Sequence, residues 1–393
     1  MKVRILLLAP LTMHSDWLFA DTLSEALATS KFTFDSRLFY FDRDFSVPSK
    51  PNATAFTAGD ITKLETGSFY GLQLGAAHYG SYLLGLTDRS AGAGTSLLEI
   101  GTNHNLSFLG EAYAKYTYGG SSFQFGRQRL NTPLANDHDL RLLPSSYNAA
   151  VFTNTDVDNT LLSIGWIESY TGFGSRLNQF DDIAKEWGGG GLAYGYIENK
   201  SLNEIKFRVQ YAKALDRANI KVGDYRYADV KWTPPGIFSW GAQFAGNDYQ
   251  REKNATVIGL LGSADFGKID VSLVYNRVFG NFFRAIESGP MYSDWQQGYG
   301  DYGPSQAFGG YLTYNYSPDL SIKLGRVNVF AKETEVLDDF TESMVDINYK
   351  LNKNHRIRIR YSIKDESTRA ESIFPLYGDR DDLRLIYYYS FSR

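Results

Sequence analysis

The segment KNHRIRIRYSI, residues 353–363, carries a basic side chain at every second position. In a β-strand, successive side chains point to opposite faces, so Arg356, Arg358 and Arg360 would share one face and the isoleucines the other. Three adjacent guanidinium groups are unstable in a dry core without partners. The segment therefore fits either a soluble sheet with its arginines in bulk water, or a membrane barrel with its isoleucines toward lipid and its arginines toward a channel.

The same two-residue period recurs along the chain, for example in SMVDINYKLN (343–352), EIKFRVQYAK (204–213) and KIDVSLVYN (268–276). Such segments number about eighteen, and each has roughly the 9 to 11 residues that a tilted membrane strand needs. We therefore predict strands at 32–41, 68–77, 80–88, 106–118, 122–129, 147–153, 160–168, 190–197, 204–213, 223–232, 237–246, 255–263, 269–277, 306–316, 320–329, 342–351, 355–364 and 381–392.

The connections between these segments alternate between short turns and longer loops. This alternation places all turns at one end of an up-and-down barrel, as in outer-membrane barrels with periplasmic turns and extracellular loops. The short turns are Gly119-Gly120, ENKSLN, TPPG (233–236), DFGK (265–268), SPD (317–319) and NKN (352–354), and the loops are about 42–67, 130–146, 169–189, 278–305 and 365–380.

Composition narrows the fold class further. Aromatic residues make up 15% of the chain, with 28 tyrosines and 37 glycines, and no apolar run approaches the roughly 20 residues of a spanning helix. A polar average with apolar alternate positions predicts an all-β, transmembrane, antiparallel up-and-down barrel of about 18 strands. The alternative is a soluble β-sandwich, solenoid or propeller, although no fixed repeat period is evident.

Other functional classes are excluded by composition. The chain has no cysteine, so it has no disulfide framework, thiolate metal site or cysteine nucleophile. Its formal net charge of -4 does not suggest nucleic-acid binding. We expect no cofactor.

The two ends of the chain carry targeting features. Lys2 and Arg4 precede a short apolar stretch, and Ala20 fits a cleavage position, so residues 1–20 are predicted to be a secretory signal peptide. Residues 21–393 then form a single barrel. The last strand alternates and ends in the aromatic Phe391, which looks like the C-terminal recognition signal of outer-membrane barrels, although two further residues follow it.

Three segments resemble the OprD family of outer-membrane porins: FDSRLFYFDRDF (34–45), GLQLGAAHYGSYLLGL (71–86) and FQFGRQRLNTPLANDHDLRLLPSSY (123–147). The resemblance implies an 18-stranded, often monomeric barrel in the outer membrane of a Gram-negative bacterium. It also implies substrate-selective diffusion through a pore that inward-folded loops narrow and a ladder of basic residues lines.

Alternation identifies the basic side chains that face inward. Several lie on neighbouring C-terminal strands, so one lumen wall is basic and would attract anions, since arginine suits carboxylates. Alternatively, the arginines pair with loop acids and only stiffen the barrel. The predicted basic ladder is Arg356, Arg358, Arg360, Lys350, Arg384, Lys323, Arg208, Lys206, Lys115 and Arg37.

The constriction is expected at the loop 130–146, because a third long loop folds inward in such porins. The loop 281–305 is the second candidate for an inward-folded loop. The constriction residues are predicted to be Asn136, Asp137, His138, Asp139 and Arg141.

Two sharper interpretations find little support. Asn154, Asp156 and Asp158 have the spacing of a calcium loop's first ligands, but the required glycine and distal glutamate are missing, so we expect no metal site. A hydrolase would need a histidine with a nucleophile and an orienting group. His14, His78, His104, His138 and His355 lie in no recognisable nucleophile motif, and we expect no enzyme.

These features predict a porin for passive, partly selective diffusion of small anionic, carboxylate-containing solutes. The expected partners are outer-membrane lipid and the solute, without nucleic acid, and we expect a monomer rather than a trimer. The alternatives are a non-conducting structural or adhesive outer-membrane barrel, or a soluble β-rich carbohydrate-binding protein.

Overall fold

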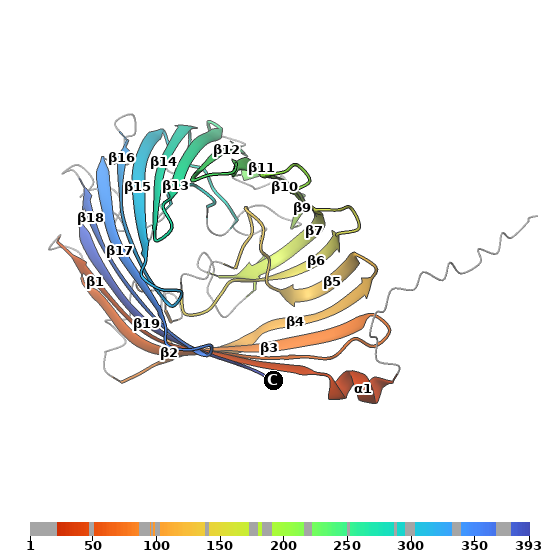
Figure 1. Ribbon diagram of the computed structural model, residues 1–393. Coiled ribbons are helices and arrows are strands. Elements are labelled where there is room, and N and C mark those ends of the chain that lie inside the picture. Colours follow the sequence, from red (N-terminus) through yellow and green to blue (C-terminus); the bar gives the residue numbers. More distant parts are fainter. Residues whose placement is uncertain are drawn as a thin grey trace, which may run out of the picture.

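The computed structural model describes residues 22–46, 51–85, 95, 97–98, 103–137, 141–172, 180–182, 191–215, 222–249, 252–286, 289–294, 303–331, 339–366 and 379–393. They form one sheet that closes into a barrel (Figure 1). A short helix, α1 (Leu23–Ala28), precedes the sheet. The strands are β1 (Lys31–Phe45), β2 (Ala53–Glu65), β3 (Leu72–Leu83), β4 (Leu106–Tyr118), β5 (Ser121–Gln128), β6 (Ser146–Asn154), β7 (Thr160–Thr171), β8 (Asp181–Asp182), β9 (Leu192–Asn199), β10 (Ile205–Ala214), β11 (Val222–Trp232), β12 (Phe238–Tyr249), β13 (Ala255–Asp265), β14 (Ile269–Gly280), β15 (Ser305–Asn315), β16 (Leu320–Phe330), β17 (Phe340–Lys350), β18 (His355–Glu366) and β19 (Arg380–Ser392).

The topology is that of an antiparallel up-and-down barrel. Strands that follow one another in sequence pair with one another, and β1 pairs with β19 to close the sheet. The two-residue β8 pairs only with the end of β7, while β7 pairs directly with β9. Without β8 the barrel has 18 strands, so the predicted fold class and strand number are confirmed.

The predicted strand positions are wrong in one region. The segments 68–77 and 80–88 are predicted as two strands, but in the structure they contribute to the single strand β3. The predicted loop 42–67 contains β2. These two errors cancel in the strand number. They arise because the polar residues Thr54, Asp60 and Thr62 interrupt the outward apolar positions of β2.

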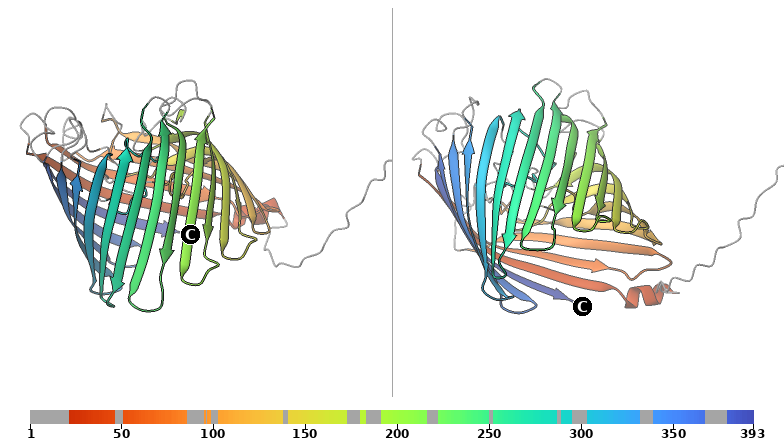
Figure 2. Two further views of the ribbon diagram at one scale, coloured as in Figure 1. Left: turned by 90° about the horizontal axis from the view of Figure 1, so that it is seen from above. Right: turned by 45° about the horizontal axis from the view of Figure 1, so that its top comes forward.

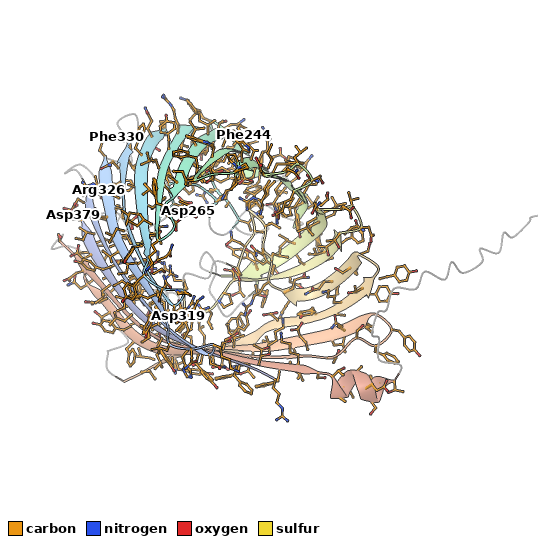
Figure 3. All side chains as sticks on the ribbon, viewed as in Figure 1. Phe244, Asp265, Asp319, Arg326, Phe330 and Asp379 are labelled. Carbon is orange, nitrogen blue, oxygen red and sulfur yellow. The ribbon has the colours of Figure 1, made fainter. Side chains whose placement is uncertain are left out.

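Alternation along each strand gives the barrel an apolar outer surface and a polar lumen. Leu273 and Phe308 are exposed on the outside, whereas Asn276 on the same strand as Leu273 is 1% exposed. Figure 3 shows side chains projecting from both faces of the sheet, with Phe244 and Phe330 on the outer surface. The faces read from the sequence for these strands are therefore correct.

The two rims of the barrel differ. The short turns gather at one rim (Figure 2, left). They connect β2 to β3, β4 to β5, β6 to β7, β9 to β10, β11 to β12, β13 to β14, β15 to β16 and β17 to β18. We call this rim the turn end and the other the loop end. Helix α1 lies at the turn end, where Thr22 caps it by accepting a hydrogen bond from Glu25 N. No helix among the described residues is long and apolar enough to cross a membrane. The predicted signal peptide, 1–20, lies outside the described residues.

Candidate functional site in the barrel lumen

Two loops from the loop end enter the lumen and touch each other. In the 129–145 loop, Leu134 N donates a hydrogen bond to Gln210 Oε1 on β10 at 2.8 Å. Ile286 N of the 281–304 loop donates to Leu134 O at 2.9 Å. Leu134 is 0% exposed. The described parts of both loops that carry these contacts therefore lie inside the barrel.

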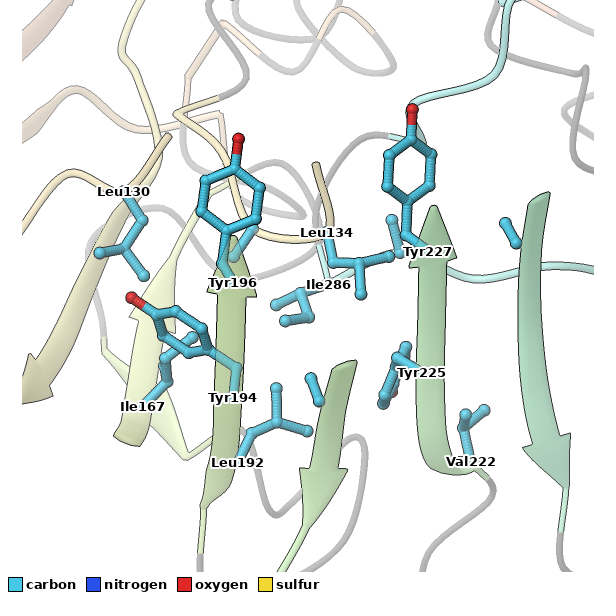
Figure 4. Packing of buried hydrophobic residues seen from close by; sticks show 14 of the residues in the cluster. Leu130, Leu134, Ile167, Leu192, Tyr194, Tyr196, Val222, Tyr225, Tyr227 and Ile286 are labelled. Carbon is cyan, nitrogen blue, oxygen red and sulfur yellow. The ribbon is translucent and has the colours of Figure 1, made fainter. Parts of the chain in front are cut away.

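The loops pack on a wall that we call the tyrosine wall, the lumen face of β6 to β12. Leu134 and Ile286 lie among its buried side chains in Figure 4. Hydroxyl groups hold the loop backbones, since Tyr147 donates to Asn136 O at 2.7 Å and Tyr249 donates to Phe282 O at 2.6 Å. Its buried or partly buried tyrosines are Tyr147, Tyr170, Tyr194, Tyr196, Tyr225, Tyr227 and Tyr249.

A second region, the basic wall, is the lumen face of β16 to β19 and β1. At its centre, Asp382 accepts two hydrogen bonds from Arg43, at 2.7 Å to Nε and 2.8 Å to Nη2. Arg384 Nη2 donates to the same carboxylate at 3.3 Å, and Arg380 adds a further positive charge beside it. All four side chains are buried. Among the described residues, these three guanidinium groups thus lie around one shared carboxylate.

The 129–145 loop also reaches this wall. Arg37 Nη1 donates to Arg141 O at 2.7 Å, and Leu142 is buried against Phe39 and Phe41 of β1. Burial, followed by the nearby positive charge of Arg43, lowers the pKa of Arg141 to about 9. Arg141 remains mostly charged at neutral pH, so the loop adds a further cation to the cluster.

A second acidic residue of the basic wall is Asp346 on β17. Arg358 Nε donates to Asp346 Oδ1 at 2.9 Å, and Arg360 Nε lies 3.5 Å from Asp346 Oδ2. Arg360 is buried, whereas the side chain of Arg358 is 22% exposed. Lys323 lies over the ring of Tyr311, with Nζ 4.1 Å from its centroid.

Toward the turn end, the basic wall opens into a cavity of about 640 Å³. Lys350, Arg356 and Lys268 line it together with Asp319, so cations outnumber acids among its charged residues. The guanidinium of Arg356 lies 3.9 Å from the centroid of the Tyr388 ring. Lys350 is exposed.

The remaining residues of the predicted ladder lie on other walls. Arg208 on β10 is paired with Asp229 at 2.7 Å, and Lys206 is paired with Glu198 at 2.9 Å. Lys115 is half-buried on the lumen face of β4. The structure thus brings together only Arg37, Lys323, Lys350, Arg356, Arg358, Arg360 and Arg384 of the predicted ladder.

The predicted constriction residues are only partly described. Asn136 and Asp137 offer backbone carbonyls to Tyr147 Oη and Ser145 N, and Arg141 lies by the basic wall. His138 and Asp139 lie outside the described residues.

Several charged lumen residues escaped the sequence analysis. Asp382 and Arg380 lie two and four residues before Arg384, and Arg43 lies six residues after Arg37. The same alternation therefore predicts that all three face inward. The buried pair Lys364–Glu366 and the Glu111 carboxylate, which binds Lys63 and Arg129, were also missed. Glu111 follows a register shift between β3 and β4. The shift breaks the alternation from which inward-facing residues are predicted.

The acidic turn at 154–159 serves the backbone. Asp156 accepts hydrogen bonds from Gly120 N at 2.8 Å and from Ser121 Oγ at 3.4 Å, which ties two neighbouring turns together. Within the described part of the chain, no three histidine or acidic side chains are grouped as metal ligands would be.

Comparison with known proteins identifies the family. The model of the outer membrane porin, OprD family, matches residues 25–229. Three solved structures share the fold. The Pseudomonas fluorescens Pf-5 BenF-like porin has a TM-score of 0.79 and 18% identity, covering 94% of this chain and 100% of its own. The structure of Pseudomonas aeruginosa OpdK with vanillate has a TM-score of 0.76 and 19% identity, and the match covers 93% of this chain and 100% of that one. Acinetobacter baumannii OccAB1 has a TM-score of 0.76 and 14% identity, and the match covers 93% of this chain and 97% of that one.

No curated protein matches the sequence. The family match covers more than half of the chain, and the three structures agree with it in their barrel fold. The turn end is therefore the periplasmic end and the loop end the extracellular end. The chain belongs to the OprD family of outer membrane porins and resides in the outer membrane of a Gram-negative bacterium.

Proposed function

We propose that the barrel passes small anionic, carboxylate-containing solutes by passive diffusion along its basic wall. The observation that carries this proposal is the cluster around Asp382. Arg43, Arg380 and Arg384 act on this carboxylate, and Arg141 and Arg360 lie close enough to interact with Arg384. Among the described residues of this cluster, guanidinium groups outnumber carboxylates where the 129–145 loop enters the lumen, and this charge favours an anion there.

The exposed part of the basic wall would provide the path itself. Arg358 is partly exposed, and Arg356 and Lys350 continue the positive charge to the periplasmic cavity. Alternate residues of one strand are about 7 Å apart, so a solute meets successive weak sites that it can enter and leave. Diffusion along such a path requires no covalent step in the lumen.

An aromatic carboxylate is a reasonable member of the solute class. One structural relative was solved with vanillate, which carries a carboxylate on a phenyl ring. In this chain, rings lie beside the cations of the path, as Tyr388 does beside Arg356 and Tyr311 beside Lys323. The path lies within one barrel, and we infer that the monomer is the conducting unit.

The test is planar-bilayer recording of the purified protein in a salt gradient, together with liposome swelling in benzoate and in its neutral analogue benzamide. We expect discrete conductance steps, a reversal potential of the sign for anion preference, and faster swelling in benzoate. Cation preference would refute the anionic path, and the absence of conductance steps would favour a structural barrel.

A matched pair of lysines flanks the turn between β17 and β18. Lys350 lines the cavity, whereas Lys353 lies exposed in the turn itself. Lys350→Gln should reduce the anion preference, and Lys353→Gln, which removes the same charge, should leave it nearly unchanged. Equal effects of both variants would mean that net charge, and not the path, sets the preference.

A further inference from the structure

Three polar side chains meet on the outer face of the barrel, away from the lumen. Asp60 lies on β2, His78 on β3 and Ser107 on β4. Their strands are adjacent, and the residues between them in the alternation, such as Ile61 and Tyr79, are buried on the lumen side. The cluster is therefore separate from the transport path.

The histidine connects the other two residues through its two ring nitrogens. His78 Nε2 lies 3.0 Å from Ser107 Oγ, and His78 Nδ1 lies 3.2 Å from Asp60 Oδ2. This is the order of nucleophile, base and orienting carboxylate that activates serine in acyl transfer. The tautomer with hydrogen on Nδ1 donates to Asp60 and leaves Nε2 to accept the serine proton.

The surroundings favour this arrangement. Thr62 Oγ1 donates to Asp60 Oδ2 at 3.4 Å. Residue 80, opposite Asp60 in the register, is glycine, and a Cβ there would lie 2.3 Å from Asp60 Oδ1. The ladder between β3 and β4 shifts register at Ala77/His78, and such irregularities redirect side chains beside active sites. The side chain of His78 is 40% exposed, so the cluster is open to the barrel's surroundings.

A cation lies farther along the same outer face. Arg127 Nη1 donates to Leu109 O at 3.0 Å, and its guanidinium lies 4.3 Å from the centroid of the Phe180 ring. Leu109 is two residues from Ser107, so their Cα atoms are about 7 Å apart. A positively charged side chain at this place can stabilise an oxyanion that forms beside Ser107.

We propose that Ser107, His78 and Asp60 form a catalytic triad that cleaves ester bonds of membrane lipids at the outer wall. A lipid is the substrate class because the exposed apolar residues Leu109, opposite His78 in the register, and Leu64, two residues from Thr62, flank the cluster on the face that contacts the membrane. No linear motif indicates the triad, because its members come from three strands.

The reaction balances within these groups and water. Ser107 Oγ bonds to the ester carbonyl carbon while its proton passes to His78 Nε2, and Arg127 stabilises the negative carbonyl oxygen. The bond to the alcohol then breaks, and His78 returns the proton to the departing alkoxide oxygen. Water, deprotonated by His78, attacks the acyl-serine, and Ser107 regains its proton as the fatty acid leaves.

The first test uses a fluorophosphonate probe on the folded protein in detergent. Attack by Ser107 forms an O–P bond and expels fluoride, and peptide mass spectrometry locates the adduct. We expect labelling at Ser107 that falls about 10²-fold in His78→Gln, which lacks the base. The matched control is Ser343, an outward serine that contacts Arg326 instead of a histidine, and Ser343→Ala should label like the wild type.

An absence of labelling at Ser107 above that at Ser343 would overturn the proposal, and so would labelling that His78→Gln leaves unchanged. Because the adduct is mapped on the wild type, this outcome does not depend on whether a variant folds. A shift in gel mobility on heating, together with unchanged bilayer conductance, verifies that each variant is a folded barrel.

The second test measures fatty-acid release from phosphatidylethanolamine in mixed micelles. Ser107→Ala should lower the rate about 10²-fold, and Arg127→Gln should lower kcat more than it raises KM. Labelling of Ser107 without fatty-acid release would refute the lipid substrate. Loss of conductance with intact labelling would instead count against the proposed transport function alone.

Discussion

The basic wall and the tyrosine wall line the same lumen in opposite ways. On the basic wall, buried guanidinium groups of Arg43 and Arg384 share the carboxylate of Asp382. On the tyrosine wall, apolar side chains and hydroxyl groups bind the two inner loops, as Tyr147 and Tyr249 do. The first wall concentrates charge, and the second positions the loops that narrow the space beside it.

The comparison shows that a charge's neighbours decide its role more than its presence in the lumen does. Arg208 on the tyrosine wall forms two hydrogen bonds with the carboxylate of Asp229, so each charge of this pair has a direct partner. Among the described residues, the arginines around Asp382 instead outnumber the carboxylate that they share. We therefore expect substitutions on the two walls to differ in both size and kind.

The largest expected effect is the loss of Asp382. Asp382→Ala leaves Arg43 and Arg384 buried with less counter-charge, which should lower the free energy of unfolding by about 3–5 kcal/mol. Asp229→Ala is the matched change on the tyrosine wall. Its partner Arg208 is 25% exposed and can turn to water, so the loss should be smaller. Urea unfolding followed by gel mobility measures both, and equal losses would contradict the distinction.

The next effect concerns the seating of the 129–145 loop. Leu134→Ala removes a fully buried side chain from the tyrosine wall and should weaken the packing of the loop by about 2–5 kcal/mol. We expect higher single-channel conductance with little change in ion preference. Leu142→Ala, near Arg141 on the basic wall, should alter the ion preference as well. If both variants changed only conductance, the loop would not couple the two walls.

A smaller effect should follow from Arg356→Gln in the periplasmic cavity. A charge that faces water contributes about 1 kcal/mol or less to the interaction with a passing anion. The anion-to-cation permeability ratio should therefore fall by less than about fivefold. The control is the double variant Arg208→Gln with Asp229→Asn, which removes a neutral pair. Reversal potentials give both ratios, and a larger shift in the control would mean that the tyrosine wall carries the selectivity.

The smallest effect is expected for Tyr249→Phe. The variant loses the hydrogen bond to Phe282 O, which contributes about 0.5–1.5 kcal/mol to holding the 281–304 loop. We expect more frequent conductance fluctuations at unchanged mean conductance. The comparison variant, Tyr388→Phe, keeps its ring beside Arg356 on the basic wall and should not increase the fluctuations.

Much of the barrel could be predicted from alternation, because one face of each strand contacts lipid and the other contacts water. β18 is the clearest case, since Ile359 and Arg360 differ in side as expected. β2 was missed for the same physical reason. Its outward residue Asp60 is held by the neighbouring His78, so a polar contact replaces the apolar stripe.

The charged cluster was less predictable. Alternation indicates which side a residue faces, but it does not give the register between strands or the path of a loop. Arg43 meets Asp382 only through the pairing of β1 with β19, and Arg141 reaches the cluster only because its loop folds inward. The excess of arginine on one wall was visible in the sequence, whereas its sharing of one carboxylate was not.

The closing pair of strands has a consequence for the timing of assembly. Arg43 and Asp382 are 339 positions apart in the chain, and Phe32 N bonds to the carbonyl of Arg393, the last residue. Contacts of such long sequence separation form late, since the intervening chain must first be organised. The basic wall includes both closing strands, β1 and β19. A chain arrested before its final strand docks would therefore have most of the barrel but an incomplete basic wall.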